Sequence, residues 1–377
     1  MFTARAGQHA RAGLRTVVEL VRAVVDVALG VAARMVRFVE AWLLDAKRAR
    51  YGLAVTRILL AATAIGLLLT NFRTRYYAFG SGSAWNGEAA QPLSDFPGIW
   101  IFSLFHRIAL NDAALTAAYL ALLVLAVLVL LGWRTKLVLP VFFVGWVSFI
   151  EMNDSLGDQG DNMFRIVLLG LLLADTSSRW SLDARRRAAA GPIAGRWLQR
   201  KWRGEPIAPE WTTNLAHNLV LVAVTCHVCF VYASGALYKA GGAPWQQGYA
   251  IYNPLSTERF GTWPELTTLL TTAAPMVTVV SWSSIIIQMC FPMMLLMRGT
   301  RIIGLLGILS FHIGIAVLMG LPWFSLSMIA IDAIFIRDVT WNHMATTVRD
   351  TWRRARTETI PPAPEPSNLP ERELTHA

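Results

Sequence analysis

The sequence predicts an all-α fold, a polytopic helical membrane protein with about eight transmembrane helices and an amphipathic helix at its N-terminus. Of its 377 residues 55% are hydrophobic and 15% are charged, whereas charged residues make up roughly a quarter of a soluble domain. The apolar residues are clustered into runs, typically of about 17–24 residues, which can cross a hydrocarbon core of about 30 Å. The net charge of +10 lies mostly between and outside these runs. It therefore indicates membrane orientation and contact with anionic lipid, and no nucleic-acid partner is expected.

The first fifty residues predict a basic amphipathic segment at the cytoplasmic or interfacial side. Residues 16–44 have a basic start and an apolar middle, but charged residues interrupt the middle and no small-residue cleavage site follows, unlike a targeting sequence. One side of the helix would be apolar and carries Val17, Val21, Val24, Val25, Ala28 and Val31. We expect this helix to lie on the membrane surface. The alternative is that it docks on a partner or on the bundle.

Eight apolar stretches define the predicted transmembrane domain, residues 51–337. They cover about 52–70, 112–132, 137–150, 163–175, 213–236, 276–297, 302–319 and 323–336. Segments 96–107 and 263–273 are too short to span and are expected in the membrane interface. Residues 338–377 form a polar tail that is expected to be largely disordered, above all in the Pro- and Glu-rich part from Pro361.

The basic residues predict the orientation of these spans. They concentrate in the N-terminal segment, 134–136, 179–203, 298–301 and the tail, whereas the alternate loops hold few. Because short cytoplasmic loops carry the excess of Lys and Arg, both termini are predicted to be cytoplasmic. The chain is accordingly expected to be a multi-pass protein of the inner (cytoplasmic) membrane.

Several polar groups are placed on the outer side by this topology. They are Lys239 at the end of the fifth span, Arg165 in the fourth, His312 within the seventh, and the acidic turn 151–162. We expect them to converge on one outward-facing cavity, where partial desolvation would tune a base. Each has a simpler alternative: a snorkelling anchor for Lys239, a neighbouring helix that satisfies His312, and a solvated loop for the turn.

The acidic turn also invites a weak divalent-cation site at Asp158 and Asp161. The stretch GDQGDN offers carboxylates at short spacing, but it lacks the length and closing glutamate of an EF-hand loop. Within the first span, Arg57 has two alternatives, a snorkelling arginine or a buried ion pair with Asp175 or Asp332.

A C-x-x-C pattern lies inside the fifth span, at Cys226 and Cys229. A redox pair needs thiolate access, and side chains one residue apart on a helix diverge, so His227 cannot readily complete a metal site. The pattern does not favour redox or metal chemistry, and it leaves the role of the two cysteines open.

Four stretches occur in a fixed order: AVTRILLAATAIGLLL (54–69), LLLADTSSRWSLD (171–183), GALYKAGGAPWQQG (235–248) and SFHIGIAVLMGLPWFSLSMIAID (310–332). Together they resemble the HTTM family, the transmembrane domain shared by vitamin K-dependent gamma-carboxylases and bacterial proteins of the sporulation-delaying protein B type. The resemblance covers about 50–337. It is greatest to the sporulation-delaying protein B type.

The resemblance implies roles for some residues. The catalytic lysine of the carboxylases corresponds to Lys239, before Trp245, although Ala236 replaces a usual glycine of the motif. His312 matches a family histidine that would line the cavity, and Arg165 with Trp245 would contact a cofactor. The carboxylases also use a histidine before the fourth span, but 151–175 contains none. We also expect no counterpart of the lumenal portion that binds propeptide in the carboxylases, and therefore do not expect a full carboxylase.

Three functions follow as hypotheses. The first is a membrane protein that works with a separately encoded small membrane partner in maturation or export of a secreted peptide. The second is a carboxylase-like enzyme with Lys239 as base and a quinone-type lipid as cofactor. A lysine base of this kind needs its pKa lowered toward neutrality by burial. The third is a non-catalytic scaffold. The sequence itself leaves open whether the chain is an enzyme.

Overall fold

The computed structural model describes residues 2–85, 87, 91–190 and 208–359, and every regular element in these ranges is helical, which confirms the all-α fold. The longer elements are α1 (Phe2–Leu44), α2 (Arg50–Thr70), α5 (Asp112–Leu131), α6 (Thr135–Ile150), α7 (Gln159–Leu173), α8 (Leu182–Ala190), α10 (Glu210–Gly241), α13 (Pro264–Thr272), α14 (Ala274–Met294), α15 (Arg298–Leu318), α16 (Pro322–Asp332) and α17 (Asp338–Thr359). Short turns of helix are α3 (Arg75–Phe79), α4 (Leu104–Ile108), α11 (Ala243–Gln246), α12 (Tyr252–Leu255), η1 (Ser83–Trp85), η2 (Phe96–Gly98), η3 (Trp100–Phe102), η4 (Asp154–Leu156) and η5 (Ala333–Phe335).

Each of the eight predicted spans corresponds to a helix, but the helices differ in length. In the described part of the chain, five are long and apolar enough to cross a membrane: α2, α5, α10, α14 and α15. Helix α6 and the α16–η5 segment are apolar but shorter, and α7 has 15 residues. At 1.5 Å per residue, such helices fall short of a hydrocarbon core of about 30 Å. Five candidate spans are therefore established, and the expected count of about eight stays a prediction.

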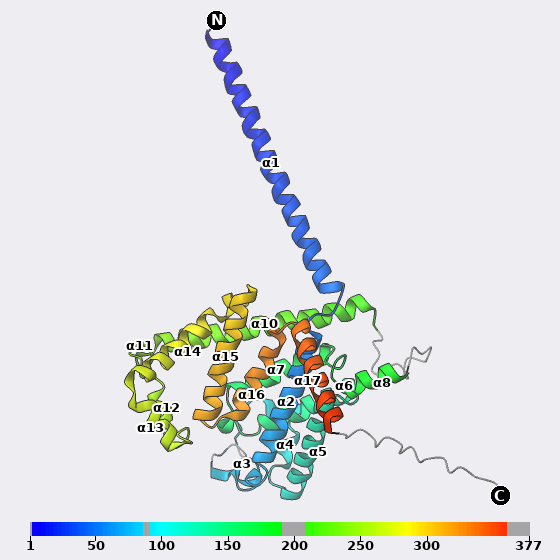
Figure 1. Ribbon diagram of the computed structural model, residues 1–377, viewed down its shortest axis with the longest axis vertical. Helices are drawn as coiled ribbons and strands as arrows, with labels where there is room; N and C mark the ends of the chain where they lie inside the picture. Colours follow the sequence, from blue (N-terminus) through cyan, green and yellow to red (C-terminus); the bar gives the residue numbers. More distant parts are fainter. Residues whose placement is uncertain (1, 86, 88–90, 191–207, 360–377) are drawn as a thin grey trace, which may run out of the picture.

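Helix α1 extends from the bundle as a single rod of 43 residues (Figure 1). Its contacts with the bundle lie near its C-terminal end, where Asn214 and Asn218 of α10 donate hydrogen bonds to the carbonyls of Leu44 and Leu43. Over the part whose side chains are described, apolar residues such as Val24 remain exposed. The predicted helix is present, and its place on a membrane surface stays a prediction.

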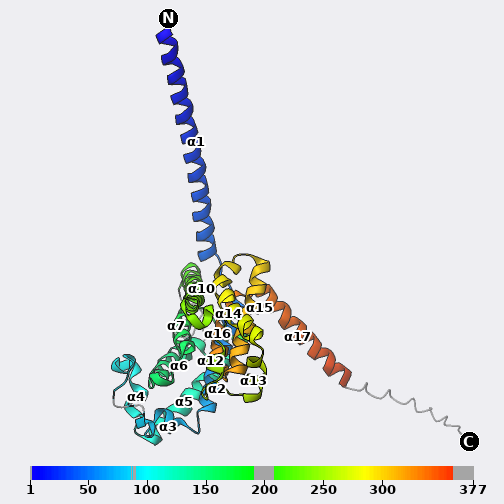
Figure 2. The ribbon, with the colours of Figure 1, turned by 90° about the vertical axis from the view of Figure 1, so that its left-hand side faces the viewer.

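Helix α2 lies at the centre of the bundle. It packs against α5, α7 and α16, while α10 packs against α14, and α15 joins the two groups by contacting both α14 and α16 (Figures 1 and 2). Glycines allow the closest approaches to α2. A Cβ at Gly66 would overlap the ring of Trp323 from α16, so the small residue is required for the two helices to meet.

An aromatic core joins α5, α6 and α7. Trp146 stacks on Phe164 with ring centroids 4.8 Å apart, and Phe149 meets Tyr119 edge-on at 5.4 Å. The Tyr119 hydroxyl is buried, and it donates a 2.6 Å hydrogen bond to the Leu68 carbonyl at the end of α2. The packed rings and the Tyr119 hydrogen bond join these three helices to the end of α2.

The connecting segments contain short helices, and the expected interfacial position of 96–107 and 263–273 stays a prediction. Segment 96–107 contains only η2, η3 and part of α4, and segment 263–273 forms α13. Residues 180–212, which connect the fourth and fifth predicted spans, include α8, and residues 191–207 lie outside the described ranges. The tail, expected to be largely disordered from residue 338, begins with a 22-residue helix, α17, and residues 360–377 also lie outside those ranges.

Candidate functional site

Helices α10, α14 and α15, with the α11–α12 segment, line a half-open cavity of about 600 Å³. Its walls are predominantly apolar and include Val280 and Ile287 of α14 and Phe311 of α15. Among the described residues that line it, only Lys239, in the last turn of α10, is charged. Trp245 of the following helix α11 contributes its ring to the wall. The cavity therefore combines a hydrocarbon-like lining with one amine.

Two aromatic rings and one amide hold the Lys239 amine. Its Nζ donates a 2.7 Å hydrogen bond to Oε1 of Gln288, a buried residue of α14. It also lies 5.4 Å from the ring centroid of Trp245 and 5.2 Å from that of Phe311. Both distances fall within the range of cation–π attraction. The amine is thus held against protein groups at the cavity, unlike a snorkelling anchor that extends into bulk water.

His312 lies on the other side of α15 from the cavity. It is 1% exposed, and its Nε2 is 3.0 Å from the hydroxyl of Tyr232 in α10. The same hydroxyl donates a 2.7 Å hydrogen bond to Oδ2 of Asp332 in α16. His312 Nδ1 and Asp332 Oδ1 are buried and have no hydrogen-bond partner in the described part of the structure. His312 is thus held by a neighbouring helix, the alternative expected for an intramembrane histidine.

Arg165 lies apart from this cavity. It forms an ion pair with Glu151 at the end of α6, and Glu151 also accepts a 2.6 Å hydrogen bond from Ser94. The Arg165 guanidinium covers the ring of Phe96 at 4.7 Å. Neither Arg165 nor the acidic turn is in the cavity wall with Lys239. The prediction of one convergent cavity was therefore wrong, because the nearby carboxylate of Glu151 captures the guanidinium.

The acidic turn begins α7. Asp158 accepts hydrogen bonds from the backbone N–H groups of Gly160 and Asp161, and Asp161 accepts one in return from the Asp158 backbone N–H. This reciprocal cap satisfies N–H groups that a helix start leaves free. Burial, with the nearby charges of Asp158 and Glu151, raises the pKa of Asp161 to about 7. Within the described residues no group of three or more potential metal ligands occurs.

Comparison with protein families decides the identity of the domain. A model of the HTTM domain matches residues 48–341, from just before α2 to the first turn of α17. The chain belongs to the HTTM family. No curated protein and no solved structure gives a significant match to it.

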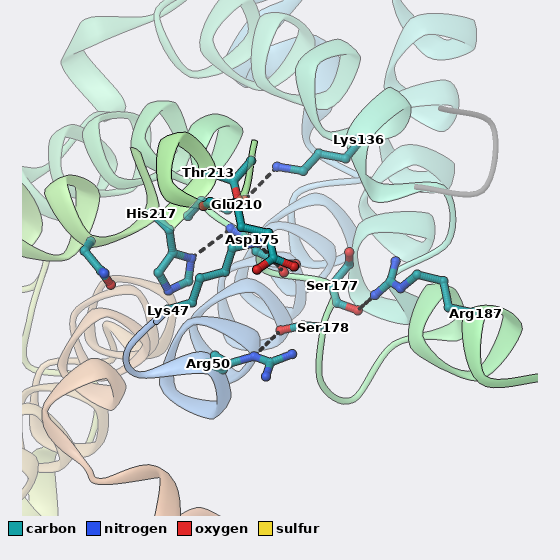
Figure 3. Close-up of polar contacts among 12 residues, drawn as sticks. Lys47, Arg50, Lys136, Asp175, Ser177, Ser178, Arg187, Glu210, Thr213 and His217 are labelled. Atoms are coloured by element: carbon teal, nitrogen blue, oxygen red, sulfur yellow. Dashed lines mark hydrogen bonds and ion pairs between the residues drawn. The ribbon is translucent and has the colours of Figure 1, made fainter. Parts of the chain in front are cut away.

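The loop that follows α7 in this HTTM domain is held by a cluster of basic residues (Figure 3). Lys47 forms a 3.1 Å ion pair with Asp175, and Lys136 Nζ donates to the Ala174 carbonyl at 2.8 Å. His217 Nδ1 accepts a hydrogen bond from the Asp175 N–H at 3.0 Å, and its Nε2 lies 2.7 Å from the Arg48 carbonyl. Since Nδ1 is the acceptor, Nε2 carries the proton and donates to that carbonyl. The cluster ties the start of α2 to α6, α7 and α10.

Arg57 reinforces the same loop from inside the HTTM domain. It is fully buried, and its guanidinium donates to the carbonyls of Thr176 at 2.9 Å and Trp180 at 2.7 Å. Both alternatives for Arg57 were therefore wrong. It does not snorkel, and it pairs with neither Asp175, which takes Lys47, nor Asp332, which takes Tyr232. Backbone carbonyls of a loop lie closer to it than either carboxylate does.

The backbone between α5 and α6 leaves room for this arginine. Gly132 ends α5 with φ of +65°, and a Cβ there would contact both Ser181 and the Arg57 guanidinium. Only glycine combines this left-handed conformation with the close approach. The loop, the arginine and the glycine therefore depend on one another.

The charge state of Asp175 gives a pH dependence that can be tested. Asp175 follows the end of α7, outside the candidate spans; burial raises its pKa, but the positive charges of Lys47, Lys136 and Arg187 outweigh this and hold it below the usual value. A carboxyl with a depressed folded-state pKa stabilises the fold above its unfolded pKa of about 3.9, and the contribution is lost as pH falls through the folded value.

We therefore expect Asp175→Asn to lower the thermal midpoint of the detergent-solubilised protein at pH 7. The difference from wild type should shrink as the pH falls below about 4, because wild-type Asp175 then becomes protonated. Thermal unfolding scans from pH 3 to 8 measure this. A difference that stays constant over that interval would contradict an ionised, paired Asp175. Asp45→Asn, a change at an exposed carboxyl, is the matched control.

Two contact residues were missed from the sequence. Gln288 holds the Lys239 amine, and Tyr232 bridges His312 and Asp332. Each is a hydrogen-bonding side chain within a long apolar helix, α14 or α10. Polar groups in such segments are costly unless satisfied, so this signal was available in principle. Which of them faces the lysine or the histidine depends on how the helices pack.

Proposed function

We propose that this HTTM protein binds a quinone-type lipid in the cavity between α10, α14 and α15, with Lys239 as the polar group that contacts it. The observation that carries the proposal is the single amine in an otherwise apolar cavity of about 600 Å³. Cavities for small molecules commonly measure about 300–1,000 Å³ and pair apolar walls with a few placed polar groups. A lipid whose apolar body carries ring oxygens matches that combination.

The wall chemistry fits such a molecule. Val280, Ile287 and Phe311 would pack against a ring and the start of an isoprenoid tail. Ser283, which also lines the cavity, is exposed on the surface of α14. Because α14 and α15 are both candidate spans, an opening between them would face lipid, so a hydrophobic molecule would enter without crossing water.

Lys239 would orient the bound ring. An ammonium has three N–H donors, and one of those of Lys239 is used by Gln288. The other two are free to donate to a ligand oxygen, and the rings of Trp245 and Phe311 favour the positive charge that makes this hydrogen bond strong. In the enzymatic form of the proposal, the resemblance to carboxylases implies that Lys239 is the base, a role that requires its amine in the neutral form. Quinone-type lipids supply redox chemistry when bound.

Lipid analysis of the purified protein tests the proposal. The full-length protein is extracted in a mild detergent, and its lipids are compared by mass spectrometry with those of the source membranes. We expect a quinone-class lipid to be enriched in the protein fraction relative to phospholipid. A fraction whose quinone content only mirrors the membranes would reject the proposal.

As a second candidate we propose a role of the sporulation-delaying protein B type, in bacterial maturation or export of a secreted peptide with a small membrane partner. The supporting observation is α1, which extends from the bundle with exposed apolar residues such as Val24, Val27 and Leu29 (Figure 1). Co-purification of a small membrane protein, lost in a Val24→Asp/Leu29→Asp variant, would favour this role. If neither a partner nor a quinone is recovered, a non-catalytic scaffold remains.

We also propose that the chain resides in the inner membrane with both termini cytoplasmic. The cluster of Lys47, Arg50, Lys136 and Arg187 gathers basic residues from three segments of the chain, the start of α2, α6 and α8 (Figure 3). Positive charge concentrated on one side supports a cytoplasmic assignment of that side.

A further inference from the structure

Helix α17 is joined to the bundle by side chains near its beginning. Asp338 accepts hydrogen bonds from the backbone N–H groups of Arg50 and Tyr51, at 3.0 and 2.9 Å. Trp341 Nε1 donates to the Ala333 carbonyl at 3.3 Å. Asn342, at the start of the second turn, accepts a 3.1 Å hydrogen bond from the Tyr51 hydroxyl. Figure 2 shows the helix extending away from the bundle to one side. Helix α17 thus starts close to the end of the last apolar segment, which ends at η5.

One side of α17 is apolar and uncovered. Met344, Val348 and Trp352 recur at intervals of four residues, so they lie along one face. Their exposed fractions are 40%, 69% and 57%. An exposed row of large apolar side chains, ending in a tryptophan, is typical of a surface that contacts another apolar phase.

Arginines border this apolar side. At 100° per residue, Arg349, Arg353 and Arg356 lie within about 60° of one another, next to Trp352. The Arg356 guanidinium stacks over the Trp352 ring at 3.8 Å. From residue 349 to 356 the helix carries four arginines and one acidic residue, Asp350. The apolar row and the positive row therefore run side by side along the same half of the helix.

We propose that α17 lies on the surface of the bilayer and binds anionic lipid headgroups through Arg349, Arg353 and Arg356 while Met344, Val348 and Trp352 enter the acyl boundary. Amphipathic helices of this composition bind at that boundary, and tryptophan favours it. The inference does not depend on the ligand of the cavity.

The position of α17 favours a membrane over a protein partner. The helix begins two residues after η5, at the end of the last apolar segment, so it starts where the bilayer surface would be. It also begins beside Arg50, which belongs to the basic cluster at the start of α2. The negative charge of an anionic leaflet would face positive charge at two places on the protein, the basic cluster and the arginines of α17.

Fluorescence of the full-length protein in nanodiscs tests this inference. In a background with Cys226→Ser, Cys229→Ser and Cys290→Ser, an environment-sensitive dye is attached at Ala355→Cys, on the apolar side, or at His343→Cys, on the opposite side. In discs containing phosphatidylglycerol we expect a blue shift at position 355 and none at 343. In discs of phosphatidylcholine alone the shift at 355 should be much smaller.

Removal of the arginines gives the quantitative test. About 1 kcal/mol per basic residue corresponds to a loss of about fivefold in membrane-bound helix for each arginine changed to glutamine. Arg349→Gln, Arg353→Gln and Arg356→Gln together should abolish the shift. The same charge change at Arg73, Arg107 and Arg259 is the matched control and should leave it intact.

Two results would overturn the inference. If position 355 shows no shift in phosphatidylglycerol discs, α17 does not contact lipid. If it shows the same shift in phosphatidylcholine discs and in detergent, the apolar side is covered by protein.

Discussion

Lys239→Met is expected to remove the quinone-type lipid from the purified protein while leaving the fold intact. The substitution keeps an unbranched apolar stem and shortens the side chain by one heavy atom, so most of the cavity wall is preserved. It deletes the one charged donor in the described wall, and a hydrogen bond to a charged group contributes roughly 1.5–3 kcal/mol. The amount of co-purified lipid should therefore fall by about 10- to 100-fold at limiting lipid concentration.

Lys136→Met is the matched control for this change. Lys136 also carries a bonded amine at a helix end, but its partner is the Ala174 carbonyl in the loop after α7. It should leave the co-purified lipid unchanged. Wild-type lipid content in the Lys239 variant would contradict the proposed contact. Loss of folded protein in that variant would instead assign Lys239 a structural role.

Arg57→Leu is expected to destabilise the protein severely. The variant leaves the Thr176 and Trp180 carbonyls without the donor that they have in wild type. Two hydrogen bonds to a charged donor are together worth about 3–6 kcal/mol, a large part of a typical stability of about 5–15 kcal/mol. We expect little monodisperse protein by size-exclusion chromatography, and a lower thermal midpoint in what remains.

Gly132→Ala tests the same contact from its other side. The new Cβ would overlap the Arg57 guanidinium and would also strain a backbone with positive φ. Gly314→Ala, in a helix with open space around the new methyl group, is the matched control and should be tolerated. Recovery of Arg57→Leu at the wild-type midpoint would show that the carbonyl contacts do not support the loop.

The helices of this protein were predictable because hydrophobic runs are local properties of the chain. Each stretch from 52–70 to 323–336 became a helix, and Gly132 marks the end of α5. The number of membrane spans was less well determined. Composition gives an apolar segment, but α7 and α16 proved shorter than a typical span.

The candidate site was only partly predictable. The sequence singled out Lys239 and Trp245, and both line the cavity. It also grouped Arg165 and His312 with them, but Arg165 pairs with Glu151 and His312 faces Tyr232. The sequence identified these polar residues as unusual for apolar segments, but it did not predict their hydrogen-bond and ion-pair partners.

The sequence by itself determined the helical class, the apolar segments, the basic segments and the family. Only the tertiary structure decided that Arg57 binds loop carbonyls, that Tyr232 bridges residues 80 and 100 positions away, and that Gln288 holds Lys239. The physical reason is that hydrophobic periodicity acts within a segment, whereas a buried polar atom must find its partner across helices. Which partner it meets depends on how the packed helices rotate and cross, and a small residue such as Gly66 decides how closely two of them approach.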